Sequence, residues 1–283
     1  MQIRAGYRIS FNCLQPMPIH LRLSVHTDRR HDLITPDALV VSVPAPMSQH
    51  IDEFGNIVTR VRAPAGPITF SSTFLIADGG APDPQLWSAR QTEVEDLPDE
   101  ALPFLLGSRY CETDRLSDLA WSLFGATPPG WARVQAIVQY VHDRIQFGYQ
   151  HARATRTAEQ GHQEGIGVCR DFAHLAVTLC RAMNIPARYC TGYLGDIGVP
   201  AVDAPMDFSA WFEAYLDGGW HTFDARHNTP RIGRVVVARG RDAADVAMTH
   251  TFGVAWMTEF QVITDEVDQQ TAALEPRSLA AAE

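Results

Sequence analysis

A short run of eight residues, 167–174 (Gly-Val-Cys-Arg-Asp-Phe-Ala-His), most constrains how this chain can fold. A glycine and a valine lead to one cysteine, Cys169, and apolar residues then recur until an Asn-Ile-Pro stop at 184–186. Because the apolar positions lie nearly all round a helix, we expect a buried core helix that begins near Cys169. The free N–H groups and the positive dipole end of its first turn would stabilise a thiolate, the nucleophilic form of cysteine.

Strand patterns follow the expected helix. The segment 187–194 is typical of a strand, and side chains alternate along 207–216, with Ser209 and Trp211 on one face. After an Asp-Gly-Gly turn, a returning strand carries Asp224 at its end. A hairpin of these two strands would bring Ser209 and Asp224 toward each other.

The cysteine run and the segments 207–215 and 219–224 together resemble the core of the transglutaminase-like superfamily of cysteine peptidases and acyltransferases, in its bacterial branch. That family carries a Cys-His-Asp triad on three such segments in this order. The resemblance implies that Cys169 is the nucleophile and Asp224 the triad carboxylate, while Ser209 stands at the position of the family histidine. It also implies an α+β, papain-like fold, in which a helix bearing the cysteine packs on an antiparallel sheet.

The missing histidine limits the chemistry that the resemblance implies. In such a triad a thiolate attacks an amide carbonyl, an imidazole carries the proton, and a carboxylate orients the imidazole. Water or an amine then resolves the thioester. Serine cannot act as a base near neutral pH, so we expect weak or absent activity. Because a buried carboxylate without a donor is costly, we expect the Ser209 hydroxyl, an ordered water or a bound small molecule to donate to Asp224.

Other histidines are candidates for a replacement base. His221 lies three residues from Asp224, which points it to the opposite face of a regular strand. His174 lies about 140° round the expected helix from Cys169, on the wrong side. The remaining candidates lie in segments whose geometry the sequence does not fix; these are His151, His162 and His227.

Three functional hypotheses remain open. In the first, the chain is a cysteine-dependent amide hydrolase or acyl transferase in which Ser209 is an isolated or engineered substitution. In the second, it is a non-catalytic relative that binds peptides in the same cleft. In the third, it is an enzyme with a relocated base. For the substrate cleft we expect Tyr149, Val168 and Trp211, the last because it shares the face of Ser209.

The rest of the chain predicts two domains and a tail. Short apolar segments separated by turns favour a small, β-sandwich-like domain with its linker over 1–103. Its turn 52–56 (Asp-Glu-Phe-Gly-Asn) resembles a turn of the N-terminal β-domain that precedes the core in bacterial members of the family. We expect the transglutaminase-like core over 104–262 and a disordered C-terminal tail over 263–283.

Composition argues against several classes of protein. A net charge of −10 argues against a nucleic-acid or anionic-membrane partner. No apolar run approaches the ~20 residues of a membrane span, and the first residues lack an apolar signal segment. Five cysteines, an odd number, indicate a reducing cytoplasm rather than a disulfide framework. No metal-ligand spacing occurs. We expect a peptide or protein substrate, no metal and no cofactor, and the oligomeric state stays open.

Overall fold

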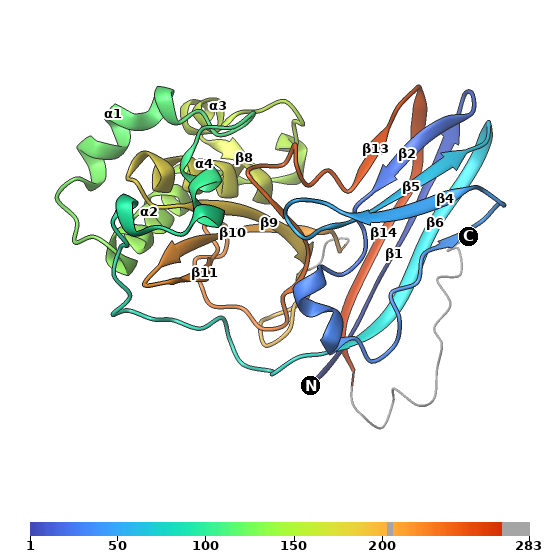
Figure 1. The fold of residues 1–283 in the computed structure, drawn as a ribbon, viewed down its shortest axis with the longest axis horizontal. Helices are drawn as coiled ribbons and strands as arrows, with labels where there is room; N and C mark the ends of the chain where they lie inside the picture. Colours follow the sequence, from blue (N-terminus) through green and yellow to red (C-terminus); the bar gives the residue numbers. More distant parts are fainter. Residues whose placement is uncertain (203–205, 268–283) are drawn as a thin grey trace.

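A computed structural model of the protein describes residues 1–202 and 206–267. Figure 1 shows two bodies side by side, a β-domain and a core that holds the longer helices. The linker after the N-terminal strands runs along one edge of both bodies before it enters the core (Figure 1). None of the helices in the described ranges is long and apolar enough to cross a membrane.

Two antiparallel sheets form the β-domain in the described part of the chain. The first has the order β14 (Ala255–Val267), β1 (Gln2–Cys13), β6 (Gly66–Ala77), β3 (Val40–Val41), and the second has the order β13 (Thr249–Thr251), β2 (Met17–Leu21), β5 (Ile57–Ala63), β4 (Met47–Ile51). Alternate side chains of β1 and β6 point inward, so Ile3, Ile9 and Phe70 are fully buried. Strong period-two patterning explains why the sequence already indicated these strands.

Both ends of the described chain contribute to the β-domain. β14 pairs with β1 along the whole length of both strands, and β13 pairs with β2. The core boundary expected at residue 262 is therefore corrected, because strand pairing places 249–267 in the β-domain. Residues 263–267, expected in a disordered tail, form the end of β14. The rest of that expected tail, 268–283, lies outside the described residues.

The core has the expected α+β architecture, with one helix packed on an antiparallel sheet. The helix is α4 (Cys169–Ala182), and the sheet has the order β11 (Gly219–Phe223), β10 (Ser209–Leu216), β9 (Ala187–Tyr193), β12 (Val235–Gly240). Phe212, Ala214 and Leu216 of β10 share one buried apolar cluster with α4. The face of β10 that carries Glu213 therefore points away from α4.

Three helices that precede α4 in the chain pack against it. Helices α1 (Thr113–Phe124), α2 (Trp131–Arg144) and α3 (Ala158–Glu164) all contact α4. β7 (Gln146–Phe147) and β8 (Ile166–Gly167) form a short parallel pair, and β8 ends two residues before Cys169. The 3-10 turns are η1 (Thr27–Asp32), η2 (Val94–Asp96), η3 (Asp99–Leu105) and η4 (Tyr149–His151).

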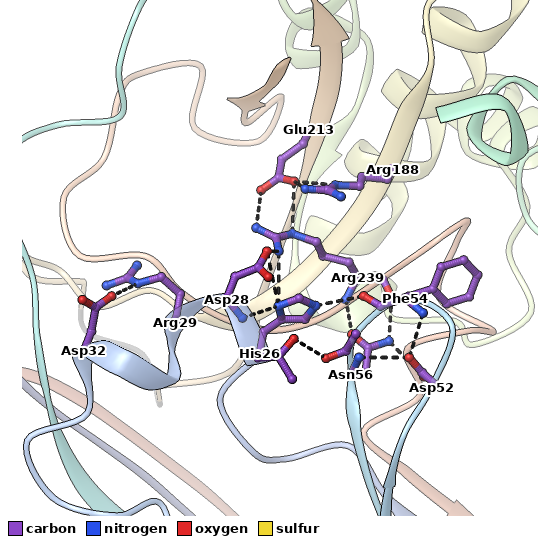
Figure 2. Close-up of polar contacts among 12 residues, drawn as sticks. His26, Asp28, Arg29, Asp32, Asp52, Phe54, Asn56, Arg188, Glu213 and Arg239 are labelled. Carbon is purple, nitrogen blue, oxygen red and sulfur yellow. Dashed lines mark hydrogen bonds and ion pairs between the residues drawn. The ribbon is translucent and has the colours of Figure 1, made fainter. Parts of the chain in front are cut away.

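A cluster of polar side chains, which we call the interdomain joint (His26, Asp28, Asn56, Glu213 and Arg239), connects the β-domain to the core sheet (Figure 2). Asn56 is fully buried. Its Nδ2 donates to the carbonyl of Arg239 at 2.8 Å, and the Arg239 N–H donates to its Oδ1 at 2.8 Å. The Arg239 guanidinium bonds Glu213 and Asp28. The amide of Asn56 thus makes the two bonds that a neighbouring strand would make with β12.

His26 contributes an imidazole to the interdomain joint. Its Nε2 lies 2.9 Å from the carbonyl of Phe54, and its Nδ1 accepts from the N–H of Asp28 at 3.2 Å. Burial lowers the pKa of His26, and the positive charge of Arg239 lowers it further. Figure 2 shows the imidazole enclosed by these partners. Protonation of His26 would place a second positive charge beside Arg239 inside the joint.

The free energy of unfolding is expected to fall as the pH drops below about 6.5. Burial lowers the pKa of His26 and, well below its ordinary value, that of His174 in α4. The unfolded chain protonates these residues near pH 6.5, so it binds more protons than the folded chain in acid. Below about pH 6.5, each of these two histidines therefore lowers the free energy of unfolding by about 1.4 kcal/mol per pH unit, until the pH reaches the pKa of that histidine in the folded protein. Urea unfolding at about pH 7.5 and about pH 5.5 measures this loss, and equal stabilities would contradict it.

Candidate active site

Cys169 is the first residue of α4, and close packing fixes its position. Gly167 has to be glycine, because a Cβ there would lie 2.6 Å from the Cβ of Asp171. Asp171 Oδ2 accepts from the N–H of Val168 at 2.9 Å and from Arg156 at 3.0 Å. These bonds hold the first turn of the helix, and therefore the thiol, in one place.

The half-buried Cys169 side chain opens into a cavity of about 400 Å³, called the cavity below. Of the residues expected at the site from sequence, Tyr149, Val168 and Ser209 line it. His227, in the loop that follows β11, lines it as well. Four separate segments of the core therefore meet around the thiol.

The surroundings of the thiol favour its protonated form. Burial raises the pKa of Cys169 to about 11, and the carboxylates of Asp207 and Asp224 act in the same direction. The positive charge of Arg226 and a hydrogen bond from the backbone N–H of Ala210 favour the thiolate. Because the raising effects dominate, attack on a carbonyl requires a group that removes the thiol proton.

An imidazole is held at the Asp224 carboxylate. Nδ1 of His227 lies 2.8 Å from Asp224 Oδ2, and Arg234 donates to the same oxygen at 2.8 Å. Burial raises the pKa of Asp224, but Arg234 and His227 outweigh burial and hold it well below its ordinary value. The carboxylate is therefore ionised, and we assign the His227 proton to Nδ1. This tautomer leaves Nε2 free to accept a proton.

Ser209 does not contact the Asp224 carboxylate. Its side chain is buried, and its hydroxyl forms no hydrogen bond with any described residue. The expectation that this hydroxyl donates to Asp224 is therefore wrong. The hairpin register explains the separation, since the pairs run from Leu216↔Gly219 to Phe212↔Phe223 and end three residues after Ser209. Protein donors already satisfy the carboxylate; they are His227 Nδ1, Arg234 and the backbone N–H groups of Arg226 and His227.

Trp211 lies away from the cavity, in contrast to the expectation from sequence. It shares the face of Ser209, but that face points away from α4. The guanidinium of Arg234 lies 5.0 Å from the centre of its ring, and the buried indole borders a separate cavity beside Glu213. Ser209 reaches the Cys169 cavity because it is the first residue of β10, at the end of the strand.

The other candidate histidines form hydrogen bonds with other groups. His151 Nε2 lies 3.3 Å from Nε2 of Gln150. His162 Nε2 lies 2.7 Å from the hydroxyl of Tyr140. His221 Nε2 lies 3.1 Å from the carbonyl of Leu216. The buried His174 accepts from the N–H of Ala243 through Nε2 at 3.1 Å. Over residues 1–202 and 206–267, no group of three or more His, Cys, Asp or Glu side chains is placed to hold a metal ion.

Comparison with known proteins places the chain in a family. The model of the transglutaminase-like superfamily matches residues 118–225. A candidate cysteine protease from Cytophaga hutchinsonii, known from its crystal structure, has a TM-score of 0.82 and 31% identity, over 95% of this chain and 91% of that chain. The chain therefore belongs to the transglutaminase-like superfamily, and its likeness to the Cytophaga protein extends over both the β-domain and the core.

Curated relatives from mycobacteria match most of the chain at lower identity. An uncharacterized protein of Mycobacterium leprae is 26% identical over 235 residues, which are 74% of this chain and 77% of that protein. An uncharacterized protein of Mycobacterium tuberculosis is 26% identical over 223 residues, which are 72% of this chain and 71% of that protein.

Proposed function

We propose that the protein is a cysteine-dependent amide hydrolase or acyl transferase in which Cys169 is the nucleophile and His227 is a relocated base. One observation carries this proposal: the thiol at the start of α4 and an imidazole bound to the Asp224 carboxylate line the same cavity. A carboxylate, an imidazole and a thiol are the three groups that this chemistry needs.

The reaction follows from the protonation states of these groups. His227 Nε2 takes the thiol proton as the sulfur of Cys169 bonds to the amide carbon. The same proton passes to the amine as the C–N bond breaks, and a thioester remains. Water or a second amine then attacks the thioester, and the thiol returns with its proton. Asp224 stays ionised and holds His227 in the tautomer that both transfers require.

Peptide or protein amides are the proposed substrates, and hydrolysis and transamidation both remain open. The five cysteines of the chain are unpaired, and four of them are buried. Unpaired cysteines suit a reducing compartment, so we retain the cytoplasm as the proposed location.

A non-catalytic, peptide-binding protein is the second candidate. The observation that favours it is the protonated, unassisted state of the Cys169 thiol. Burial raises the pKa of Cys169 to about 11, and no hydrogen bond joins its sulfur to His227 in the described structure. Catalysis therefore requires the imidazole to reach the thiol, directly or through one water, when substrate binds. Catalytic hydrogen bonds are often long in apo structures and shorten in the complex with substrate.

Trapping of the thioester tests the proposed function. The protein is mixed with a p-nitrophenyl ester of a short N-acylated peptide, quenched in acid and digested for mass spectrometry. We expect the acyl group on the peptide that contains Cys169, and its release by hydroxylamine. Cys169→Ala should give no adduct, whereas Cys13→Ala in the β-domain should behave like the native chain. Peptide binding without any adduct at Cys169 would favour the non-catalytic candidate.

A further inference from the structure

Arg226 holds a positive charge in the cavity, and no carboxylate in the described ranges forms an ion pair with it. Its N–H donates to Asp224 Oδ1 at 3.0 Å, and its carbonyl lies 3.0 Å from Nδ1 of His142. Its guanidinium carbon lies 3.8 Å from the centre of the Phe147 ring. The half-buried side chain lines the cavity together with Cys169. The backbone and the ring thus fix a charge that a bound molecule can reach.

The neighbouring arginines differ from Arg226 because protein acceptors already occupy them. Arg231 donates to the carbonyl of Gly195 at 2.9 Å and lies 3.6 Å from Asp196. Arg234 is bound between two carboxylates, and Arg170 donates to backbone carbonyls. Of the arginines that line the cavity in the described structure, Arg226 is therefore the one without a carboxylate partner.

Asp207, an acidic residue that also lines the cavity, has its own local partner. Asp207 accepts from the N–H of Phe208 at 2.6 Å. Burial raises the pKa of Asp207, and the charge of Arg226 acts against this rise. The two side chains interact electrostatically without forming an ion pair in the described structure. A ligand carboxylate could approach the guanidinium more closely than Asp207 does.

We propose that Arg226 binds a carboxylate of the substrate, close to the amide bond that Cys169 attacks. This inference rests on the proposed function and names the substrate class of that site. A guanidinium binds a carboxylate through two parallel N–H···O bonds, which fix orientation as well as charge. Apolar side chains complete the cavity, among them Leu194, Val202 and Phe208. The site therefore suits an amide that joins one acidic group to an apolar remainder.

Two alkylating reagents test this inference without any turnover. The thiolate of Cys169 attacks the CH2 carbon of iodoacetate or iodoacetamide and displaces iodide, and of the two reagents only iodoacetate carries a carboxylate. The ratio of their rate constants at Cys169 is therefore independent of the thiol pKa. We expect this ratio to exceed that of free cysteine by about tenfold or more, the range of one charge-assisted bond. A ratio equal to that of free cysteine in the native chain would overturn the proposal.

Variants of Arg226 show whether this residue causes the preference. Arg226→Gln should return the ratio to the value for free cysteine, and Arg226→Lys should retain part of the preference through its charge. Arg90→Gln is the control, because its side chain is 87% exposed and lies outside the cavity. A high ratio that persists in a folded Arg226→Gln protein would assign the preference to another group and overturn the proposal.

Binding to Cys169→Ala separates the two sources of carboxylate and separates this inference from the proposed function. Calorimetry compares a short peptide ending in a free carboxylate with its C-terminal amide, and an internal glutamate with glutamine. A preference for the free C-terminus or for the internal glutamate supports the inference if it is lost in the double variant Cys169→Ala, Arg226→Gln. The preference that is lost also identifies which carboxylate Arg226 binds. It would do so even if no peptide is ever cleaved. Equal binding of all four peptides would contradict it.

Discussion

Replacement of His227 with glutamine is expected to lower kcat/KM for an amide substrate by roughly a hundredfold to ten-thousandfold, the usual contribution of a general base. Glutamine can still donate to Asp224, but it cannot take the proton of Cys169. Since burial raises the pKa of that thiol to about 11, the loss of the base leaves little thiolate near neutral pH. Steady-state hydrolysis of a peptide anilide measures the effect.

Two further variants make this first prediction specific. His221→Gln is the matched control, because His221 lies in β11 of the same hairpin, with its Nε2 3.1 Å from the Leu216 carbonyl and outside the cavity. Ser209→His restores an imidazole at the family position, and we expect it to recover activity in the His227→Gln background. Full activity of His227→Gln alone would exclude a relocated base. A large gain from Ser209→His in the native background would show that His227 does not serve as an efficient base.

Asn56→Ala is expected to lower the free energy of unfolding by about 3–5 kcal/mol. The substitution removes both bonds to the backbone of Arg239 and leaves a buried N–H and a buried carbonyl without partners. Each such group costs about 1–3 kcal/mol. The side chain is 0% exposed, so water cannot replace the lost bonds without opening the interdomain joint. Urea unfolding followed by circular dichroism measures the loss.

An isosteric variant separates hydrogen bonding from packing in the interdomain joint. Asn56→Asp keeps the shape and can accept from the Arg239 N–H, but it turns an oxygen toward the Arg239 carbonyl. We expect it to be at least as destabilising as Asn56→Ala, because two acceptors then face each other in a buried site. Wild-type stability in either variant would mean that the amide of Asn56 does not hold the two domains together.

The central part of the fold was predictable because its signals are local. The cysteine run predicted the start of α4, and alternation along 207–216 predicted β10 and its faces. The pairing of β13 and β14 was not predictable, since their partners lie at the opposite end of the chain and leave no local pattern. Apolar and polar residues alternate in the same way whether a strand pairs within the core or with a sheet formed by the other end of the chain.

The candidate site was predictable only in part, for a similar reason. Cys169 begins a regular helix, and Asp224 directly follows a regular strand. His227 stands in a turn, and the carbonyl of Asp224 accepts from the N–H of Asn228, which has a positive φ of 50°. This turn brings the imidazole back onto the carboxylate, and sequence periodicity cannot predict such a reversal. The one available signal was a histidine three residues beyond the aspartate at the family's triad position.

The pairing of β14 with β1 also means that the first sheet of the β-domain is completed only after the core has been synthesised. The ribosome makes β1 first, but the strand that covers its outer edge is complete only at residue 267. All segments of the core are made in between, so the core can fold while the first sheet still has an open edge. An open strand edge is a template for pairing with other chains. The nascent protein is therefore most exposed to aggregation in the interval between completion of its core and completion of β14.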